Sequence, residues 1–189
     1  MTAVGHEQSY DVVSKSKGIT VISVRPIAST DWPVYREVRL QALKDSPQAF
    51  GGTWQQEALL PEQDWSTRAI ASESGQSGRG FFAINKDEVC GLAWCLISDS
   101  NPHVANIYAL WTAPSVRGQG AGRALLEKCI AWANNKGVRH IRLSVTQDES
   151  PAMQLYKSKG FCTVGEPEFL RPGSDVMTQK MELRLAVDV

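Results

Sequence analysis

The sequence predicts one domain of mixed α/β or α+β class. Its 189 residues suit a single domain, and stretches of strand length alternate along it with amphipathic stretches of helix length. Residues 89–97 and 107–111 are almost continuously apolar, as strands covered on both faces are. A buried strand then leads through a glycine-rich loop into a long helix, which gives at least one strand–helix–strand unit.

The elements are expected in the order β-α-α-β-β-β-α-β-α-β-β. Residues 1–18 lack periodicity and are expected to form a flexible tail, so that the domain occupies residues 19–189. Ser29, Thr30 or Asp31 is expected to cap the first helix, and Ser150 the last. The expected strands are residues 19–24, 81–84, 89–97, 104–112, 141–145, 161–164 and 176–185.

The second helix is expected to begin near residues 61–64 and to bury Trp65 and Ile70 on one face. Residues 72–80, rich in Ser and Gly, should then form an exposed loop. Leu125 and Cys129 mark the apolar stripe of the third helix, which should end at Gly137.

The charge composition disfavours a nucleic-acid partner. Lys and Arg total 20 and Asp and Glu total 20, whereas nucleic-acid binders usually carry a basic excess. No stretch approaches the roughly 18 apolar residues of a bilayer span, and the first residues lack the apolar centre of a signal peptide. We therefore expect a soluble protein of the cytoplasm, without nucleic-acid or membrane partners.

The four cysteines predict no metal or redox centre. Cys90, Cys95, Cys129 and Cys162 match no zinc or CxxC spacing. A cysteine inside an apolar run usually behaves as a small hydrophobic residue, so all four are expected to be buried structural thiols.

The glycine-rich stretch of residues 117–124 is the most informative part of the sequence. It follows a buried strand and opens a long helix, so its glycines allow the backbone to turn tightly against a ligand. Backbone N–H groups and the helix N-terminus can then bind an anion such as a pyrophosphate.

Three other kinds of glycine-rich loop are alternatives to an anion site of this type. It can be a tight connection without a ligand. A Walker loop is excluded because no Gly-Lys-Ser or Gly-Lys-Thr follows. A dinucleotide fold is disfavoured because the third glycine of its spacing is replaced by Arg123, and because Arg139 and Arg142 stand where an acidic residue is required.

Residues 111–122 resemble the central motif of the GNAT superfamily of N-acetyltransferases. Arg117, Gly120 and Gly122 occupy its three defining positions, and Pro114 stands where the motif has proline. Residues 152–161 are similar to the family's Ala-x-x-Leu-Tyr-x-x-x-Gly-Phe helix. The resemblance covers roughly residues 19–185 and is strongest over residues 107–164.

The resemblance implies a mixed, mostly antiparallel sheet of about seven strands flanked by about four helices. The fourth and fifth strands should splay apart, with acetyl-CoA in the gap. The implied reaction moves an acetyl group from acetyl-CoA directly to a primary amine of a small molecule or protein, without a metal. Similar proteins are often homodimers, but no feature of this sequence specifies the oligomeric state.

The resemblance also assigns residues to the co-substrate. Backbone amides of the loop should bind the pyrophosphate, and the strand before it should pair with the peptide-like pantetheine arm. The residues expected at the pyrophosphate are Arg117, Gly118, Gln119, Gly120, Ala121, Gly122 and Arg123, and those expected at the pantetheine arm are Leu110, Trp111 and Thr112.

Tyr156 stands at the position of the family's general acid, where a phenol would protonate the leaving thiolate. A tyrosine of the core is the alternative. Many relatives have an asparagine seven residues earlier that bonds the pantetheine arm, and here that residue is Glu149. Ser150 either replaces this contact or only caps the helix.

The general base is not assigned, because the fourth strand offers Asn106 and Tyr108 but no acid. Glu57 and Glu149 are weak candidates beside ordered water, and His103 and His140 are expected at a turn and a strand start. Aromatic residues are expected to line the acceptor pocket in part and to pack in the core in larger part: Trp54, Trp65, Trp94, Trp111, Tyr108 and Phe169.

Two other functions remain open at this point. A non-catalytic module that senses acyl-CoA would keep the loop and lose the chemistry, since a fold alone never guarantees an activity. A nicotinamide oxidoreductase is disfavoured by the glycine spacing and by the missing acidic residue.

Overall fold

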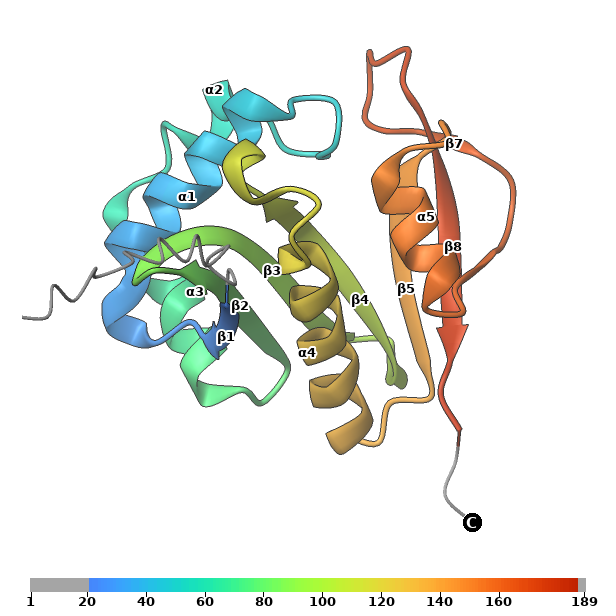
Figure 1. Ribbon diagram of the computed structural model, residues 1–189, viewed down its shortest axis with the longest axis horizontal. Coiled ribbons are helices and arrows are strands. Elements are labelled where there is room, and N and C mark those ends of the chain that lie inside the picture. The colour runs from blue at the N-terminus through green and yellow to red at the C-terminus, as the bar shows by residue number, and fades with distance from the viewer. Residues whose placement is uncertain (1–20, 187–189) are drawn as a thin grey trace, which may run out of the picture.

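The computed structural model describes residues 21–186, in which a mixed sheet of eight strands is flanked by helices (Figure 1). The expected tail, residues 1–18, lies outside the described residues. The strand order is β1-β2-β3-β4-β5-β8-β6, and β7 pairs with β8 beside this path. Only β4 and β5 pair in parallel; all other neighbours are antiparallel, which confirms the predicted sheet.

The strands are β1 (Ile22–Pro26), β2 (Gly78–Asn85), β3 (Glu88–Ser98), β4 (Asn101–Thr112), β5 (His140–Thr146), β6 (Cys162–Thr163), β7 (Glu168–Phe169) and β8 (Met177–Arg184). The helices are α1 (Trp32–Asp45), α2 (Trp54–Glu57), α3 (Glu62–Ser74), α4 (Ala121–Asn135) and α5 (Pro151–Ser158), with 3₁₀ turns η1 (Ser29–Asp31) and η2 (Pro114–Val116). The short elements α2 and β7 were not predicted from the sequence.

The two faces of the sheet carry separate apolar cores. Phe81 and Ala93 point into the core that α4 covers, whereas their neighbours Phe82 and Trp94 point into the core that α1 and α3 cover. This is the alternation of side chains along a strand. Because both faces are covered, β2 and β3 read as continuously apolar in the sequence.

The first strand lies about two residues later than expected. Residues 22–26 pair with β2, and Pro26 is the last residue of the ladder, opposite Phe81. The proline is tolerated because β1 is an edge strand, where one N–H group faces no partner.

Two predictions about the helix expected near residues 61–64, which is α3, are wrong. Ile70 is 55% exposed, and Trp65 shares the buried face with Ala69 and Ser72 instead, at helical spacing. Ser72 is fully buried and not in a loop: its hydroxyl donates to the Ile27 carbonyl at 2.9 Å and accepts from the Gly80 N–H at 2.9 Å. Residues 72–80 therefore contain the end of α3 and the start of β2.

The cysteine prediction holds for three residues and is wrong for one. Cys90, Cys95 and Cys129 are buried, whereas Cys162 is exposed on the short edge strand β6. Within residues 21–186, no helix combines the length and the apolarity that a bilayer crossing requires.

Candidate functional site

The parallel pairing of β4 with β5 is short. It joins Val104 to His140, Ala105 to Ile141 and Asn106 to Arg142, and no further pair follows among the described residues. Beyond Asn106 the two strands diverge, each keeping only its outer neighbour, β3 or β8. The predicted splay is therefore present, and it leaves one edge of each strand with free backbone groups.

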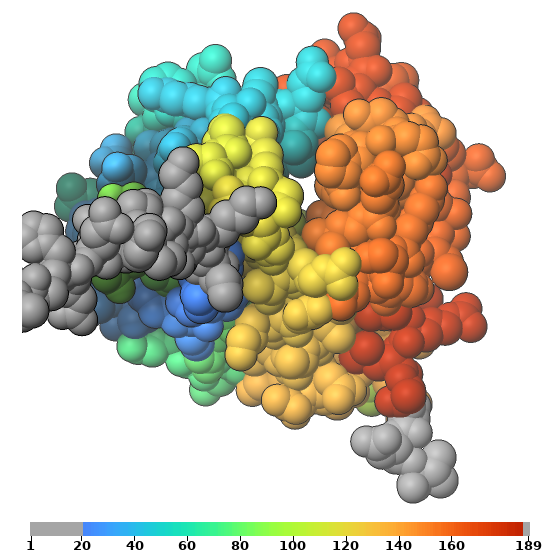
Figure 2. All heavy atoms as spheres, in the orientation of Figure 1, coloured from blue at the N-terminus to red at the C-terminus, as the bar shows by residue number. Residues whose placement is uncertain are grey.

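A cleft of about 1400 Å³ occupies this opening. Its floor is formed by residues 106–112 of β4 and 142–146 of β5, and its mouth by the start of α4 and by α5. In Figure 2 the yellow segment that begins α4 and the orange segment that holds α5 lie on the two sides of this opening.

A bulge in β4 bends the strand at the point of divergence. Leu92 pairs with Trp111 but Trp94 pairs with Tyr108, so Ala109 and Leu110 together face one residue of β3. Ala109 has a φ of 55°, the left-handed region that an alanine adopts only at a cost of roughly 1–2 kcal/mol. Bulges increase the local twist and bend of a strand. Nothing in the sequence marks this position, because the usual glycine is absent.

The loop of residues 117–123 has the geometry of an anion site. Gly118 and Gly120 adopt φ values of 74° and 90°, and Gly120 is the N-cap residue of α4. Among the described residues, the N–H groups of Gly118, Gly120 and the first three residues of α4 have no hydrogen-bond acceptor within the protein. A methyl group added at Gly118 or Gly120 would meet nothing within 4 Å, so the space beside these amides is open.

The side chain of Arg117 serves a different purpose from its backbone. It forms an ion pair with Asp45 at the end of α1 and donates to the Thr112 carbonyl at 3.2 Å. The indole N–H of Trp111 also donates to the Asp45 carboxylate, at 2.8 Å. Asp45 thus fixes the glycine loop and the end of β4 to α1.

The role of Asp45 was not predicted from the sequence. Partial burial alone would raise its pKa, but hydrogen bonds from Ser46, Trp111 and Arg117 outweigh this effect and hold the pKa below its ordinary value. The residues around Asp45 carry no signal for partners that lie 66 and 72 residues away.

Eleven of the twelve predicted site residues line the cleft. The exception is Gln119, whose side-chain amide donates to the Ser115 carbonyl at 2.8 Å and so stabilises the loop. The lining residues are Leu110, Trp111, Thr112, Arg117, Gly118, Gly120, Ala121, Gly122, Arg123, Ser150 and Tyr156.

Ser150 and Glu149, at the start of α5, differ in whether they line the cleft. Ser150 caps the helix by accepting from the Met153 N–H at 3.2 Å, and it also lines the cleft. Glu149 is not among the lining residues; its exposed carboxylate pairs with Lys157 at 2.9 Å.

Tyr156 belongs both to the core and to the lining of the cleft. It is 6% exposed and packs in the core beside Phe161, with ring centroids 6.0 Å apart. It also lines the cleft. Burial raises the pKa of this phenol to about 12, so it stays protonated at neutral pH.

The two weak base candidates, Glu57 and Glu149, are paired with other side chains. Glu57 accepts two hydrogen bonds from Arg39, and His140 lies 3.1 Å from Glu182 at the start of β5. Neither Glu57, Glu149, His103 nor His140 lines the cleft. Among the described residues the lining acids are Glu168, paired with Lys180 at 2.6 Å, and Glu182. Hydrogen bonds from Arg142 and His140 hold the pKa of Glu182 below its ordinary value, despite some burial.

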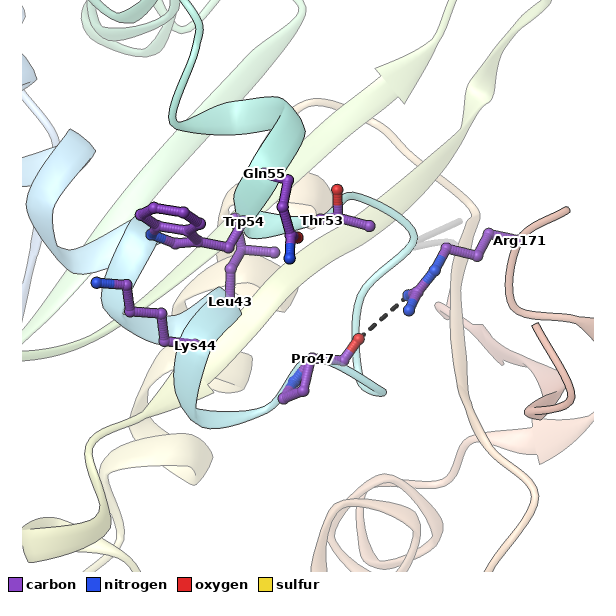
Figure 3. Close-up of a pocket in the computed structure, with 7 residues that line it drawn as sticks. All are labelled: Leu43, Lys44, Pro47, Thr53, Trp54, Gln55 and Arg171. Carbon is purple, nitrogen blue, oxygen red and sulfur yellow. Dashed lines mark hydrogen bonds between the residues drawn. The ribbon is translucent and has the colours of Figure 1, made fainter. Parts of the chain in front are cut away.

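The far wall of the cleft is held by a contact across the molecule. Arg171, which follows β7, donates to the Pro47 carbonyl at 3.1 Å (Figure 3). It also donates to the Phe50 carbonyl, at 2.8 Å. Beside this contact lies a smaller pocket of about 360 Å³, which Trp54 lines. Of the other predicted aromatic residues, Tyr108, Trp111 and Phe169 line the main cleft, whereas Trp65 and Trp94 pack in the core.

An open mixed sheet, with free amides at the start of a helix beside the opening, defines a protein that binds an extended, anion-bearing ligand between two strands. The sequence matches the model described as acetyltransferase (GNAT) family over residues 39–161, more than half of the chain. The protein therefore belongs to the GNAT acetyltransferase family.

Two curated relatives are acetyltransferases of named compounds. The chain is 29% identical over 150 residues to a mycothiol acetyltransferase from Geodermatophilus obscurus, covering 77% of this chain and 45% of the relative. It is 32% identical over 97 residues to a streptothricin acetyltransferase from Streptomyces lavendulae, covering 51% of each. The chain thus spans about half the length of these relatives.

A solved structure shares the fold. It is a candidate acetyltransferase from Salmonella typhimurium with its cofactor acetyl-CoA, and it has a TM-score of 0.74 at 16% identity. The likeness covers 90% of this chain and 97% of that one. The described residues of the present protein contain no group of three or more His, Cys, Asp or Glu side chains that could hold a metal ion.

Proposed function

We propose that this protein transfers an acetyl group from acetyl-CoA to a primary amine. The observation that carries the proposal is the opening between β4 and β5, with five free amides at one side of it. Acetyl-CoA would supply an activated thioester and a pyrophosphate. The free amides of Gly118 and of residues 120–123 suit the pyrophosphate, because a helix N-terminus favours negative charge. The free edge of Leu110–Thr112 suits the peptide-like pantetheine arm.

The amine must be neutral when it attacks, since its protonated form has no lone pair. Among residues 21–186, no acid that lines the cleft is free to take the proton: β4 contributes Asn106 and Tyr108, and the lining acids Glu168 and Glu182 are paired. We propose that the proton leaves through water in the open cleft.

Tyr156 would act on the leaving sulfur. As the amine nitrogen bonds to the thioester carbon, the carbon–sulfur bond breaks and negative charge moves onto sulfur. Full transfer from a phenol with a pKa of about 12 to a thiolate with a pKa near 8.5 is uphill, so Tyr156 stabilises the sulfur chiefly by donating a hydrogen bond. The proton released by the amine finally restores the neutral thiol.

The predicted contribution of Tyr156 is measurable. A hydrogen bond to a charged group contributes about 1.5–3 kcal/mol, so Tyr156→Phe should lower kcat roughly 10- to 150-fold. The KM for acetyl-CoA should stay within about twofold, because the phenyl ring still packs against Phe161. Full turnover of Tyr156→Phe at every pH would remove the hydroxyl from the mechanism.

The acceptor is proposed to be a small molecule, since both curated relatives are named after one. We also propose that the protein acts in the cytoplasm, where acetyl-CoA is made and its three buried thiols stay reduced. Homodimerisation follows from the family resemblance alone and is tested by the mass of the protein in solution.

The first experiment is thermal unfolding with and without acetyl-CoA. A ligand at 100 times its dissociation constant should add about 2.7 kcal/mol of stability. The gain should disappear in Gly120→Val, because a β-branched side chain at φ 90° is strained and fills the space beside the amides. Gly137→Val has similar backbone strain at the far end of α4 and is the matched control that should keep the gain.

The outcomes separate the candidate functions. Stabilisation by acetyl-CoA followed by transfer to an amine supports the enzyme. Stabilisation without transfer to any amine of a broad panel would instead favour the acyl-CoA sensor. No stabilisation at millimolar acetyl-CoA would mean that the loop is only a structural connection.

A further inference from the structure

A buried arginine in the cleft has donors that no group of the protein uses. Arg39 lies on α1, is 8% exposed and lines the cleft. Its Nε and Nη2 donate to the two carboxylate oxygens of Glu57, at 3.0 Å and 2.6 Å. Its third nitrogen, Nη1, is buried and has no hydrogen-bond partner among the described residues. Five buried side-chain nitrogens of the described residues lack a partner, and of these only Nη1 belongs to a residue that lines the cleft, where a ligand can supply one.

The guanidinium of Arg39 is held rigidly. The ring of Phe50 lies against it, with 4.8 Å between the guanidinium carbon and the ring centroid. Phe50 is fixed in turn, because its carbonyl accepts from Arg171. A Cβ at Gly52 would lie 2.4 Å from Glu57 Oε1, so glycine is needed for the chain to pass this ion pair. An arginine fixed in this way loses little entropy when it binds a ligand.

The charge around Arg39 is not balanced. Glu57 also lies 3.7 Å from Arg68, so two guanidinium groups share one carboxylate. The cluster of Arg39, Arg68 and Glu57 therefore carries a net charge of +1. Arg68 is 41% exposed to solvent, so Glu57 compensates chiefly the buried Arg39; a planar carboxylate is the group that best suits the N–H groups of a guanidinium.

The position of Arg39 assigns this anion to the acceptor. The pyrophosphate loop begins α4, whereas Arg39 lies in the middle of α1, six residues or about 9 Å before Asp45. The neighbouring lining residues Phe50, Gly51 and Gly52 come from the loop that Arg171 holds against the segment after β7. Arg39 thus lines the cleft beside this loop, more than one helical turn along α1 from the carboxylate that contacts the glycine loop.

We propose that the acceptor is an amine that also carries a carboxylate, and that Arg39 Nη1 binds this carboxylate. The inference rests on the proposed function, since it names the substrate class of that site. The carboxylate would complete the hydrogen bonding of Arg39 and neutralise the cluster. Glu57 and Phe50 position the guanidinium, and Arg171 positions Phe50.

The test compares matched acceptors at saturating acetyl-CoA: lysine against cadaverine, and leucine against isopentylamine. Each pair differs only in the carboxylate. The wild-type protein should favour the amino acid of at least one pair by 10-fold or more in kcat/KM, with the difference mainly in KM. Arg39→Gln combined with Glu57→Gln removes both charges and should reduce that preference to within about twofold. Equal use of both members of each pair, or an unchanged preference in the double variant, would overturn the inference.

A second measurement is independent of catalysis. Isovalerate, a carboxylate without an amine, should raise the melting temperature of the wild-type protein with coenzyme A bound, but not that of the double variant. Glu57→Gln alone keeps the guanidinium and should keep the response, which controls for the loss of the ion pair. If isovalerate acts in this way but no amine is acetylated, the carboxylate site stands and the proposed reaction fails. If amines are acetylated without preference and isovalerate has no effect, the reaction stands and the carboxylate site fails.

Discussion

Replacing Asp45 should release the glycine loop from α1 and reveal what this carboxylate contributes. Asp45 accepts from the indole of Trp111 and forms an ion pair with Arg117. Asp45→Ala removes both contacts. Asp45→Asn keeps a side-chain oxygen that can accept from the indole, but it loses the negative charge opposite Arg117. The pair of variants therefore separates the hydrogen bond from the ion pair.

The expected losses of stability follow from how exposed the two partners of Asp45 are. Trp111 is 4% exposed, and a buried donor left without an acceptor costs about 1–3 kcal/mol. The side chain of Arg117 is 48% exposed, so its ion pair contributes at most about 1 kcal/mol after screening by solvent. Asp45→Ala should thus cost about 2–3 kcal/mol, and Asp45→Asn about 1 kcal/mol or less. For a domain of this size, the corresponding falls in Tm are roughly 4–12 °C and 2–4 °C.

Calorimetry of both variants at pH 7 tests the difference. Trp111→Phe lacks the indole donor, and in that background Asp45→Ala should cost only what the ion pair contributed. Equal destabilisation by Asp45→Ala and Asp45→Asn would refute the reasoning, because it would mean that the indole finds another partner.

The pH dependence of the Tm provides an independent check of the Asp45 contacts. The folded pKa of Asp45 is lowered, so its ionisation stabilises the protein fully above the unfolded pKa of about 3.9 and loses this effect as pH falls through the folded value. The Tm difference between wild type and Asp45→Asn should stay constant from about pH 5 to 8 and narrow below about pH 4.

Two further variants test the packing around the sheet. Ser72→Ala should cost about 2–4 kcal/mol, because it leaves two buried backbone groups without their partner. Ser66→Ala, on the exposed side of the same helix, should cost under about 0.5 kcal/mol. Similar denaturant midpoints for the two variants would contradict this. Ala109→Gly should stabilise the protein by up to about 1 kcal/mol, because glycine adopts the positive φ without strain. Ala105→Gly in the same strand should destabilise the protein. A loss of stability in both variants would show that the bulge is not strained.

The sequence predicted best what depends on neighbouring residues. The break between the expected strands 81–84 and 89–97 is a tight turn, in which Lys86 and Asp87 have positive φ values, as a tight hairpin requires. The cap at Ser150 and the glycine geometry of the loop were predicted for the same reason: each depends on a few residues within one turn.

What was missed depends on contacts between distant segments. Ser72 looked like a loop residue because serine is common in loops, and only its partners Ile27 and Gly80 explain its burial. The contacts of Asp45 likewise appear only when α1 and β4 are placed together. Ala109 carries no signal, since its bulge arises from the register of β3 against β4.

The short ladder between β4 and β5 has a consequence for cooperativity. Only three residue pairs of backbone ladder join a half-sheet of β1–β4 to a half-sheet of β5–β8 among the described residues, so the ladder has an internal boundary that the core under α4 and the contacts of Arg171 span. Such boundaries separate segments that can open independently. A ligand arm that pairs along β4 and also contacts β5 would bridge this boundary and merge the two halves into one unfolding unit. Occupancy of the cleft would then decide whether the domain melts in one step or in two.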